Sequence, residues 1–228
     1  MVVRIFKLAF FIVMLLPVAT AHATDVNARL ALAQRGKHER VTPAVIWLTP
    51  LAATPATARP GKYTLLQKDK AFSPHLVVVA VGSAVSFPNA DPFFHNVFSL
   101  FDGKRFDLGL YEAGSMRTVT FSREGVSYIF CNIHPDMSAV ILSLSTPYFS
   151  VANDDGVFHM AAVPSGSYEL HVWVEGRRDD ALNHLTRQVS VAADGVVDLG
   201  LVEAGPASQP STHLNKFGKP YEMDHKTY

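Results

Sequence analysis

The chain contains 228 residues, and its 20 Lys and Arg side chains balance its 20 Asp and Glu side chains. A balanced charge provides no basic surface for a phosphate backbone, so nucleic acid is not an expected partner. The single cysteine cannot form a disulfide bond within the chain, and an odd cysteine in an exported protein indicates an intermolecular bridge, a reactive thiol or a metal ligand.

The first 23 residues have the features of a secretory signal. Arg4 and Lys7 precede an apolar run over residues 8–18, and Ala21-His22-Ala23 has the small-x-small form of a cleavage site. The apolar run is too short to span a bilayer comfortably. We therefore predict a signal peptide over residues 1–23, a periplasmic location and no stable insertion in the membrane.

The rest of the chain is predicted to be all-β, with antiparallel sheets packed as sandwiches. Residues 25–34 could form a short helix, but we expect the first strand there because the fold class around them is all-β. The composition of residues 49–61 predicts a linker, and residues 205–228 are predicted to be a polar tail that is extended or disordered. Between them, short apolar or alternating runs are separated by turn residues. The further predicted strands are residues 44–48, 63–67, 75–79, 84–87, 96–100, 117–121, 126–130, 139–144, 157–161, 167–174 and 187–191.

The stretch CNIHPDM follows the predicted strand at residues 126–130 and carries three potential metal donors. Cys131 offers a thiolate, His134 an imidazole and Met137 a thioether. A tight loop after the strand can turn all three side chains toward one point, and Pro135 stiffens this loop because its ring fixes φ.

A second imidazole has to come from elsewhere, and His95 is the best candidate because it lies between a turn and a strand. Two His, one Cys and a Met form the donor set of a blue-copper electron-transfer site, whereas zinc rarely takes a thioether. His75 is the competing histidine. It opens a strand away from the turn that should hold the first ligand, so we expect it to be structural.

The stretches GSAVSFPNADPFFHNV and GVSYIFCNIHPDM resemble the cupredoxin (blue copper) family, in its amicyanin- and plastocyanin-like branch. The resemblance implies a Greek-key β-sandwich over residues 61–146 that binds one copper ion in a type 1 site. It also implies that His95, Cys131 and His134 bind the copper and that Met137 is the weak axial ligand. Asn96 would tie the two ligand-bearing loops together by hydrogen bonds.

A second resemblance begins after residue 146. Asp154, Gly156 and Phe158 form a D-x-G-x-F pattern, followed by a P-x-G-x-Y pattern that begins at Pro164. Both are similar to the carboxypeptidase regulatory-like sandwich module.

Residues 147–204 are short for an independent sandwich, and residues 26–58 look like its missing first hairpin. We therefore expect residues 44–48 to pair with residues 168–173. The copper domain would then be inserted within the second sandwich.

The expected function is the transport of single electrons between redox proteins that bind transiently. His134 is the expected electron exit, and Phe93, Phe94 and Pro135 are expected to form an apolar contact patch beside it. The alternative is a periplasmic copper-binding, copper-delivery or partner-docking protein without an electron-transfer role. We do not expect an enzyme, because the chain lacks the paired His-x-His motifs of multicopper enzymes.

Overall fold

A computed structural model describes residues 23–31, 42–52, 57–100, 103–177, 182–193, 196–203 and 214–221. In these ranges the regular structure is all-β except for one short 3-10 helix, Asn183–Leu185, which confirms the predicted fold class. The predicted signal peptide lies outside the described residues except for Ala23. None of the described residues form a helix with the length and apolar character needed to cross a bilayer.

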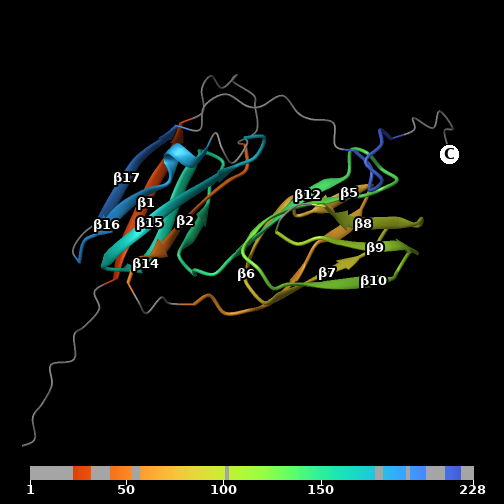
Figure 1. Cartoon of the computed structure of the whole chain (residues 1–228), viewed down its shortest axis with the longest axis horizontal. Coiled ribbons are helices and arrows are strands. Elements are labelled where there is room, and N and C mark those ends of the chain that lie inside the picture. Colours follow the sequence, from red (N-terminus) through yellow and green to blue (C-terminus); the bar gives the residue numbers. More distant parts are fainter. Residues whose placement is uncertain are drawn as a thin grey trace, which may run out of the picture.

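The strands form two lobes (Figure 1). The outer lobe contains a three-stranded sheet of order β14-β1-β17 and a four-stranded sheet of order β13-β2-β15-β16. Alternate residues of β1 are buried, so it presents one face to the apolar core of this lobe. The strands are β1 (Ala23–Ala31), β2 (Ala44–Pro50), β13 (Phe149–Val151), β14 (Val157–Pro164), β15 (Gly166–Val174), β16 (Arg187–Val191) and β17 (Val196–Glu203).

Strand β2 pairs with β15, although more than a hundred residues separate them in the chain. The pairing is antiparallel, with Leu48 opposite Leu170 and Ile46 opposite Val172. The predicted pairing of residues 44–48 with residues 168–173 is therefore confirmed. Segments from both ends of the chain thus build the outer lobe.

The inner lobe contains a three-stranded sheet of order β10-β7-β3, a five-stranded sheet of order β6-β12-β11-β8-β9 and the hairpin β4-β5. Its core joins aromatic side chains such as Phe87 and Phe121 to Cys131 and Met137. The strands are β3 (Lys62–Thr64), β4 (Leu66–Lys68), β5 (Ala71–Ser73), β6 (Leu76–Ala80), β7 (Ser83–Pro88), β8 (His95–Ser99), β9 (Phe106–Tyr111), β10 (Met116–Phe121), β11 (Gly125–Phe130) and β12 (Ser138–Leu144).

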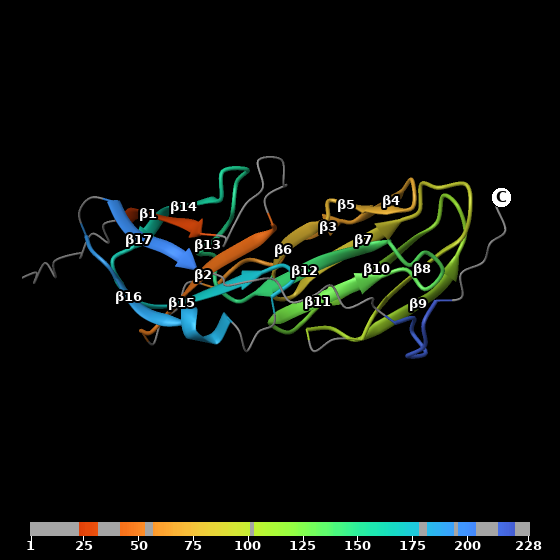
Figure 2. The same cartoon turned by 90° about the horizontal axis from the view of Figure 1, so that it is seen from above.

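The two lobes meet where β2 and β15 face β12 (Figure 2). Val45 and Trp173 of the outer lobe form one buried apolar cluster with Val140 and Leu142 of the inner lobe, and Trp47 packs against it. Because Trp47 and Trp173 are the only two tryptophans of the chain, intrinsic fluorescence reports on this contact.

An ion pair also crosses between the lobes. His75 Nε2 lies 2.6 Å from Glu175 Oε1, and the hydrogen bond to Glu175 raises the pKa of His75 above its ordinary value of 6.5. A histidine with a raised pKa stabilises the folded state below its unfolded pKa, and this contribution is lost as the pH rises through the folded pKa. We therefore expect wild type to unfold at a higher temperature than His75→Gln at pH 5.5 and at a similar temperature at pH 8.5.

Both side chains are partly exposed, so the pair contributes at most about 1 kcal/mol, or about 2–4 °C for a chain of this size. Thermal unfolding followed by tryptophan fluorescence measures the difference, with His184→Gln, at an exposed position, as control. If the difference in unfolding temperature between wild type and His75→Gln stays constant or grows with pH, the stabilisation does not come from the His75–Glu175 ion pair.

The structure differs from the sequence-based prediction in several strands and connections. The sheets are mixed rather than antiparallel, because β1–β17, β6–β12 and β3–β7 are parallel pairs. The strand predicted over residues 63–67 is divided into β3 and β4. Strands β5, β9, β13 and β17 were not predicted, and β2 continues through Pro50 into the expected linker. Strand β9 was not predicted because Gly109, with φ of +67°, interrupts its run of strand-forming residues. Residues 214–221 of the predicted tail are not extended away from the protein. They contact the inner lobe at the end that holds Cys131.

Candidate metal centre

Two neighbouring strands bring His95 and Cys131 together. His95 begins β8, and Cys131 directly follows β11. The two strands are antiparallel, with Phe130 opposite Phe98, so the start of one lies beside the end of the other. This arrangement places residues 36 positions apart in the chain within contact distance.

His134 completes a group of three donors. The Cys131 Sγ atom lies 3.8 Å from His95 Nδ1 and 3.4 Å from His134 Nδ1. One ligand atom from each of the three residues lies within 4.8 Å of the others, and this is the only such group of His, Cys, Asp and Glu found in the described ranges. The structure therefore brings together three of the four residues predicted as metal ligands.

Main-chain hydrogen bonds close the loop that carries Cys131, His134 and Met137. The Cys131 N–H donates to the Met137 carbonyl, and the Met137 N–H donates to the His134 carbonyl, both at 3.1 Å. The Met137 side chain is only 1% exposed and belongs to the same apolar core as Cys131. The loop is thus compact, and its methionine is buried in the same core cluster as the cysteine.

The donors differ in their exposure to solvent. His95 and Cys131 are fully buried, whereas His134 is half-buried. The Phe93 ring packs against both imidazoles, with ring centroids 5.3 Å from His95 and 5.6 Å from His134. The group therefore has a dry interior side and one imidazole near the surface.

The surroundings favour the metal-binding form of His134, and they favour the protonated thiol of Cys131 in the absence of a metal. Burial lowers the pKa of His134, and the nearby His95 and Lys70 lower it further, so its imidazole stays neutral and can bind a metal. Burial raises the pKa of the Cys131 thiol, although main-chain N–H groups of Asn96, Ile133 and His134 oppose this shift by hydrogen bonding to the sulfur. A bound cation would deprotonate the thiol.

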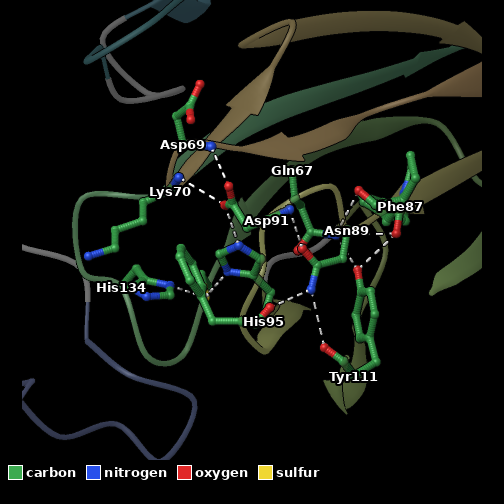
Figure 3. Close-up of polar contacts among 12 residues, drawn as sticks. Gln67, Asp69, Lys70, Phe87, Asn89, Asp91, His95, Tyr111 and His134 are labelled. Carbon is green, nitrogen blue, oxygen red and sulfur yellow. Dashed lines mark hydrogen bonds and ion pairs between the residues drawn. The ribbon is translucent and has the colours of Figure 1, made fainter. Parts of the chain in front are cut away.

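Asp91 is a residue that the sequence analysis missed. Its Oδ2 lies 2.8 Å from His95 Nε2 (Figure 3), which leaves His95 Nδ1 on the side of Cys131. A carboxylate that holds the second nitrogen of a metal-binding histidine fixes the ring and increases its basicity. The sequence places Asp91 only four residues before His95, and this short spacing could have indicated a contact between the two side chains.

The β4–β5 turn holds the Asp91 carboxylate. The Asp69 and Lys70 N–H groups donate to it at 2.7 and 3.0 Å (Figure 3). Both residues adopt positive φ, 54° and 56°, as in the tight turns of β-hairpins. Burial alone would raise the pKa of Asp91, but the hydrogen bonds from Lys70, His95 and Asp69 outweigh it and lower this pKa. Asp91 is therefore charged in neutral solution.

Asn96 contacts the candidate ligands through its main chain. Its N–H donates to the Cys131 sulfur, while its side-chain Nδ2 donates to Asp107 Oδ1 on β9 at 2.6 Å. The main-chain contact runs from the His95 segment to Cys131, and the side chain reaches a neighbouring strand. The role of Asn96 in tying the two ligand loops together stays a prediction.

Tyr221 also contacts the site. Its hydroxyl donates to the Cys131 carbonyl at 2.8 Å. Burial raises the pKa of Tyr221 to about 12, and the neighbouring Cys131 contributes to this shift. The hydroxyl therefore remains protonated and able to donate. Nothing in the sequence of the tail indicated this contact.

The donors fit copper. A buried thiolate, two imidazoles and a nearby thioether are soft and borderline ligands, which suit copper, whereas Mg²⁺ and Ca²⁺ require oxygen ligands. The Asp91 carboxylate is hydrogen-bonded to His95 and to the β4–β5 turn and does not belong to the donor group.

The comparisons with known proteins give partial structural matches. No family model and no curated protein matches the chain. A Cu-containing nitrite reductase from Thermus scotoductus is 23% identical with a TM-score of 0.36, and the match covers 42% of this chain but only 25% of the nitrite reductase. A purple cupredoxin from Nitrosopumilus maritimus is 22% identical with a TM-score of 0.33, covering 36% of this chain and 99% of that protein.

Amicyanin from Paracoccus versutus is 21% identical with a TM-score of 0.33, and the match covers 42% of this chain and 91% of amicyanin. These three neighbours are two cupredoxins and a copper enzyme, and each match covers less than half of this chain. At these identities and TM-scores they establish neither a family nor a function for it.

Proposed function

We propose that this protein is an exported electron carrier that binds one type 1 copper ion through His95, Cys131, His134 and Met137. The observation that carries the proposal is the convergence of the Cys131 sulfur and two imidazole nitrogens within 4.8 Å of one another. Export through a signal peptide over residues 1–23 would place the protein in the periplasm.

Copper, when bound, supplies a one-electron change between Cu(I) and Cu(II). The protein itself holds the donor atoms in fixed positions. Asp91 fixes the His95 ring, and main-chain hydrogen bonds close the loop from Cys131 to Met137. Donors that move little suit rapid electron transfer, because little rearrangement accompanies the change of charge.

His134 is the proposed route for electrons into and out of the site, because it is the half-buried donor of the group. Phe94 and Ile133, 54% and 44% exposed, lie next to His95 and His134 in the chain, and Pro135 is also exposed. A small apolar surface suits a redox protein that binds briefly and excludes water from the contact.

We also propose that the copper domain, residues 61–146, is inserted between two parts of a carboxypeptidase regulatory-like sandwich, residues 26–58 and 147–204. The pairing of β2 with β15 supports this organisation. Insertion is tolerated when the two ends of the inserted domain lie close together. In this organisation, the outer lobe carries the copper domain and covers part of one face of its larger sheet, at β12 and its neighbours β6 and β11.

Retention of copper after reduction distinguishes an electron carrier from a copper-delivery protein. We expect voltammetry of the copper-loaded protein to give one reversible one-electron wave. We also expect reduced protein to keep Cu(I) for hours beside a stoichiometric Cu(I) chelator, because the buried donors are held by hydrogen bonds. Loss of Cu(I) to the chelator within minutes, with no reversible wave, would favour copper delivery.

A further inference from the structure

Residues 214–221 lie against the inner lobe at the end away from the outer lobe (Figures 1 and 2). Hydrogen bonds and an ion pair contribute to holding them there. Tyr221 donates to the Cys131 carbonyl at 2.8 Å, the Lys216 N–H donates to Asn132 Oδ1 at 2.9 Å, and Lys216 Nζ lies 2.7 Å from Asp107 Oδ2. The segment therefore contacts the candidate ligand Cys131 and the residue that follows it.

The segment has its own closed turn. Asn215 Oδ1 accepts hydrogen bonds from the Phe217 and Lys219 N–H groups at 2.9 and 3.1 Å. The Asn215 N–H donates to the Lys219 carbonyl, and Gly218 adopts a φ of +72°, which glycine tolerates without strain. This turn fixes the distance between Lys216 and Tyr221, so their contacts reinforce each other.

A second connection runs from Lys216 to the other side of the site. Asp107 pairs with Lys216 and also accepts a hydrogen bond from Asn96 Nδ2 at 2.6 Å. The main-chain N–H of Asn96 in turn donates to the Cys131 sulfur. The segment thus reaches Cys131 directly at its carbonyl and indirectly at its sulfur.

From these contacts we infer that residues 214–221 are a clamp of the candidate metal centre, in which Tyr221 and Lys216 are positioning residues that hold Cys131 in place. The copper-dependent consequences of the clamp rest on the proposed function, but the clamp itself acts on the copper-free protein. Its loss should let the Cys131 loop open more often, which exposes the thiol and speeds the escape of a bound metal.

The direct test measures the reactivity of Cys131 in copper-free protein with the thiol reagent DTNB. Cys131 is the only thiol of the chain and is fully buried, so the labelling rate reports on opening of its loop. Tyr221→Phe removes one hydrogen bond and should speed labelling about 2- to 10-fold, the equivalent of one ordinary hydrogen bond. The double variant with Lys216→Ala should label faster still.

The matched control is Lys219→Ala, which removes the same charge from an exposed position of the same turn and should label at the wild-type rate. Lys216→Arg keeps the ion pair with Asp107 and should also remain close to wild type. Labelling of the double variant at the wild-type rate would overturn the clamp. So would equal acceleration in Lys219→Ala.

The second readout is the rate at which copper-loaded protein loses Cu(II) to excess EDTA. The double variant should lose copper faster than wild type, and Lys219→Ala should not. If wild type shows no type 1 spectrum, the proposed function fails, whereas the DTNB result still decides the clamp. If wild type shows a type 1 spectrum and both rates are unchanged in the double variant, the clamp fails and the proposed function stands.

Discussion

We expect Cys131→Ser to abolish the intense visible absorption proposed for the copper-loaded protein, because that band requires a thiolate bound to Cu(II). The hydroxyl of serine is a much poorer copper ligand than a thiolate. We expect copper affinity to fall by at least about 100-fold. Loss of a ligand's hydrogen-bond partner alone costs up to about this factor, and loss of the ligand itself should cost at least as much. Absorption spectra and competition with a copper chelator measure the two effects.

His75→Gln is the control for this prediction, because His75 pairs with Glu175 and lies outside the donor group. It should keep both the spectrum and the affinity of wild type. A Cys131→Ser protein that retains the intense band, or a His75→Gln protein that loses it, would show that the wrong residues have been proposed as copper ligands.

We expect Asp91→Asn to weaken copper binding about 10- to 100-fold and to raise the reduction potential of the proposed copper site. The affinity falls because the carboxylate that orients His95 is replaced by a neutral amide. The potential rises because removing a buried negative charge near the site destabilises Cu(II) more than Cu(I). Voltammetry and chelator competition on the same preparation test both directions.

Asp91→Asn keeps the shape of the side chain and an oxygen acceptor for the β4–β5 turn, so the fold should persist. Asp136→Asn is the matched control, since Asp136 is exposed in the ligand loop and its charge is screened by water. A potential that falls in Asp91→Asn, or shifts as much in Asp136→Asn, would exclude a specific role for Asp91.

The central group of donors could be predicted from sequence because most of it is local. Cys131, His134 and Met137 share one short loop after a strand, so their spacing alone indicates that they can converge. The choice of His95 depended on which turn faces that loop. The pairing of β8 with β11 explains why the turn before His95 does so. The all-β class followed from alternating apolar runs.

The residues that hold the donors could not be predicted in the same way. The role of Asp91 depends on the β4–β5 turn, 21 and 22 positions away, whose N–H groups keep the carboxylate in place. Residues 214–221 have the polar, aperiodic composition of a free tail. Their contacts with Asp107 and Cys131, 109 and 90 positions away, exist only because the fold brings those segments together.

The visible absorption and electron paramagnetic resonance spectra of the purified protein with one equivalent of Cu(II) test the central claim most directly. We predict an intense blue or purple band with narrow copper hyperfine splitting, both lost on reduction by ascorbate and recovered on re-oxidation. That result would mean that Cys131 binds copper as a thiolate and that the site carries one electron reversibly. A colourless protein, or copper with the wide splitting of ordinary nitrogen and oxygen ligands, would contradict the assignment.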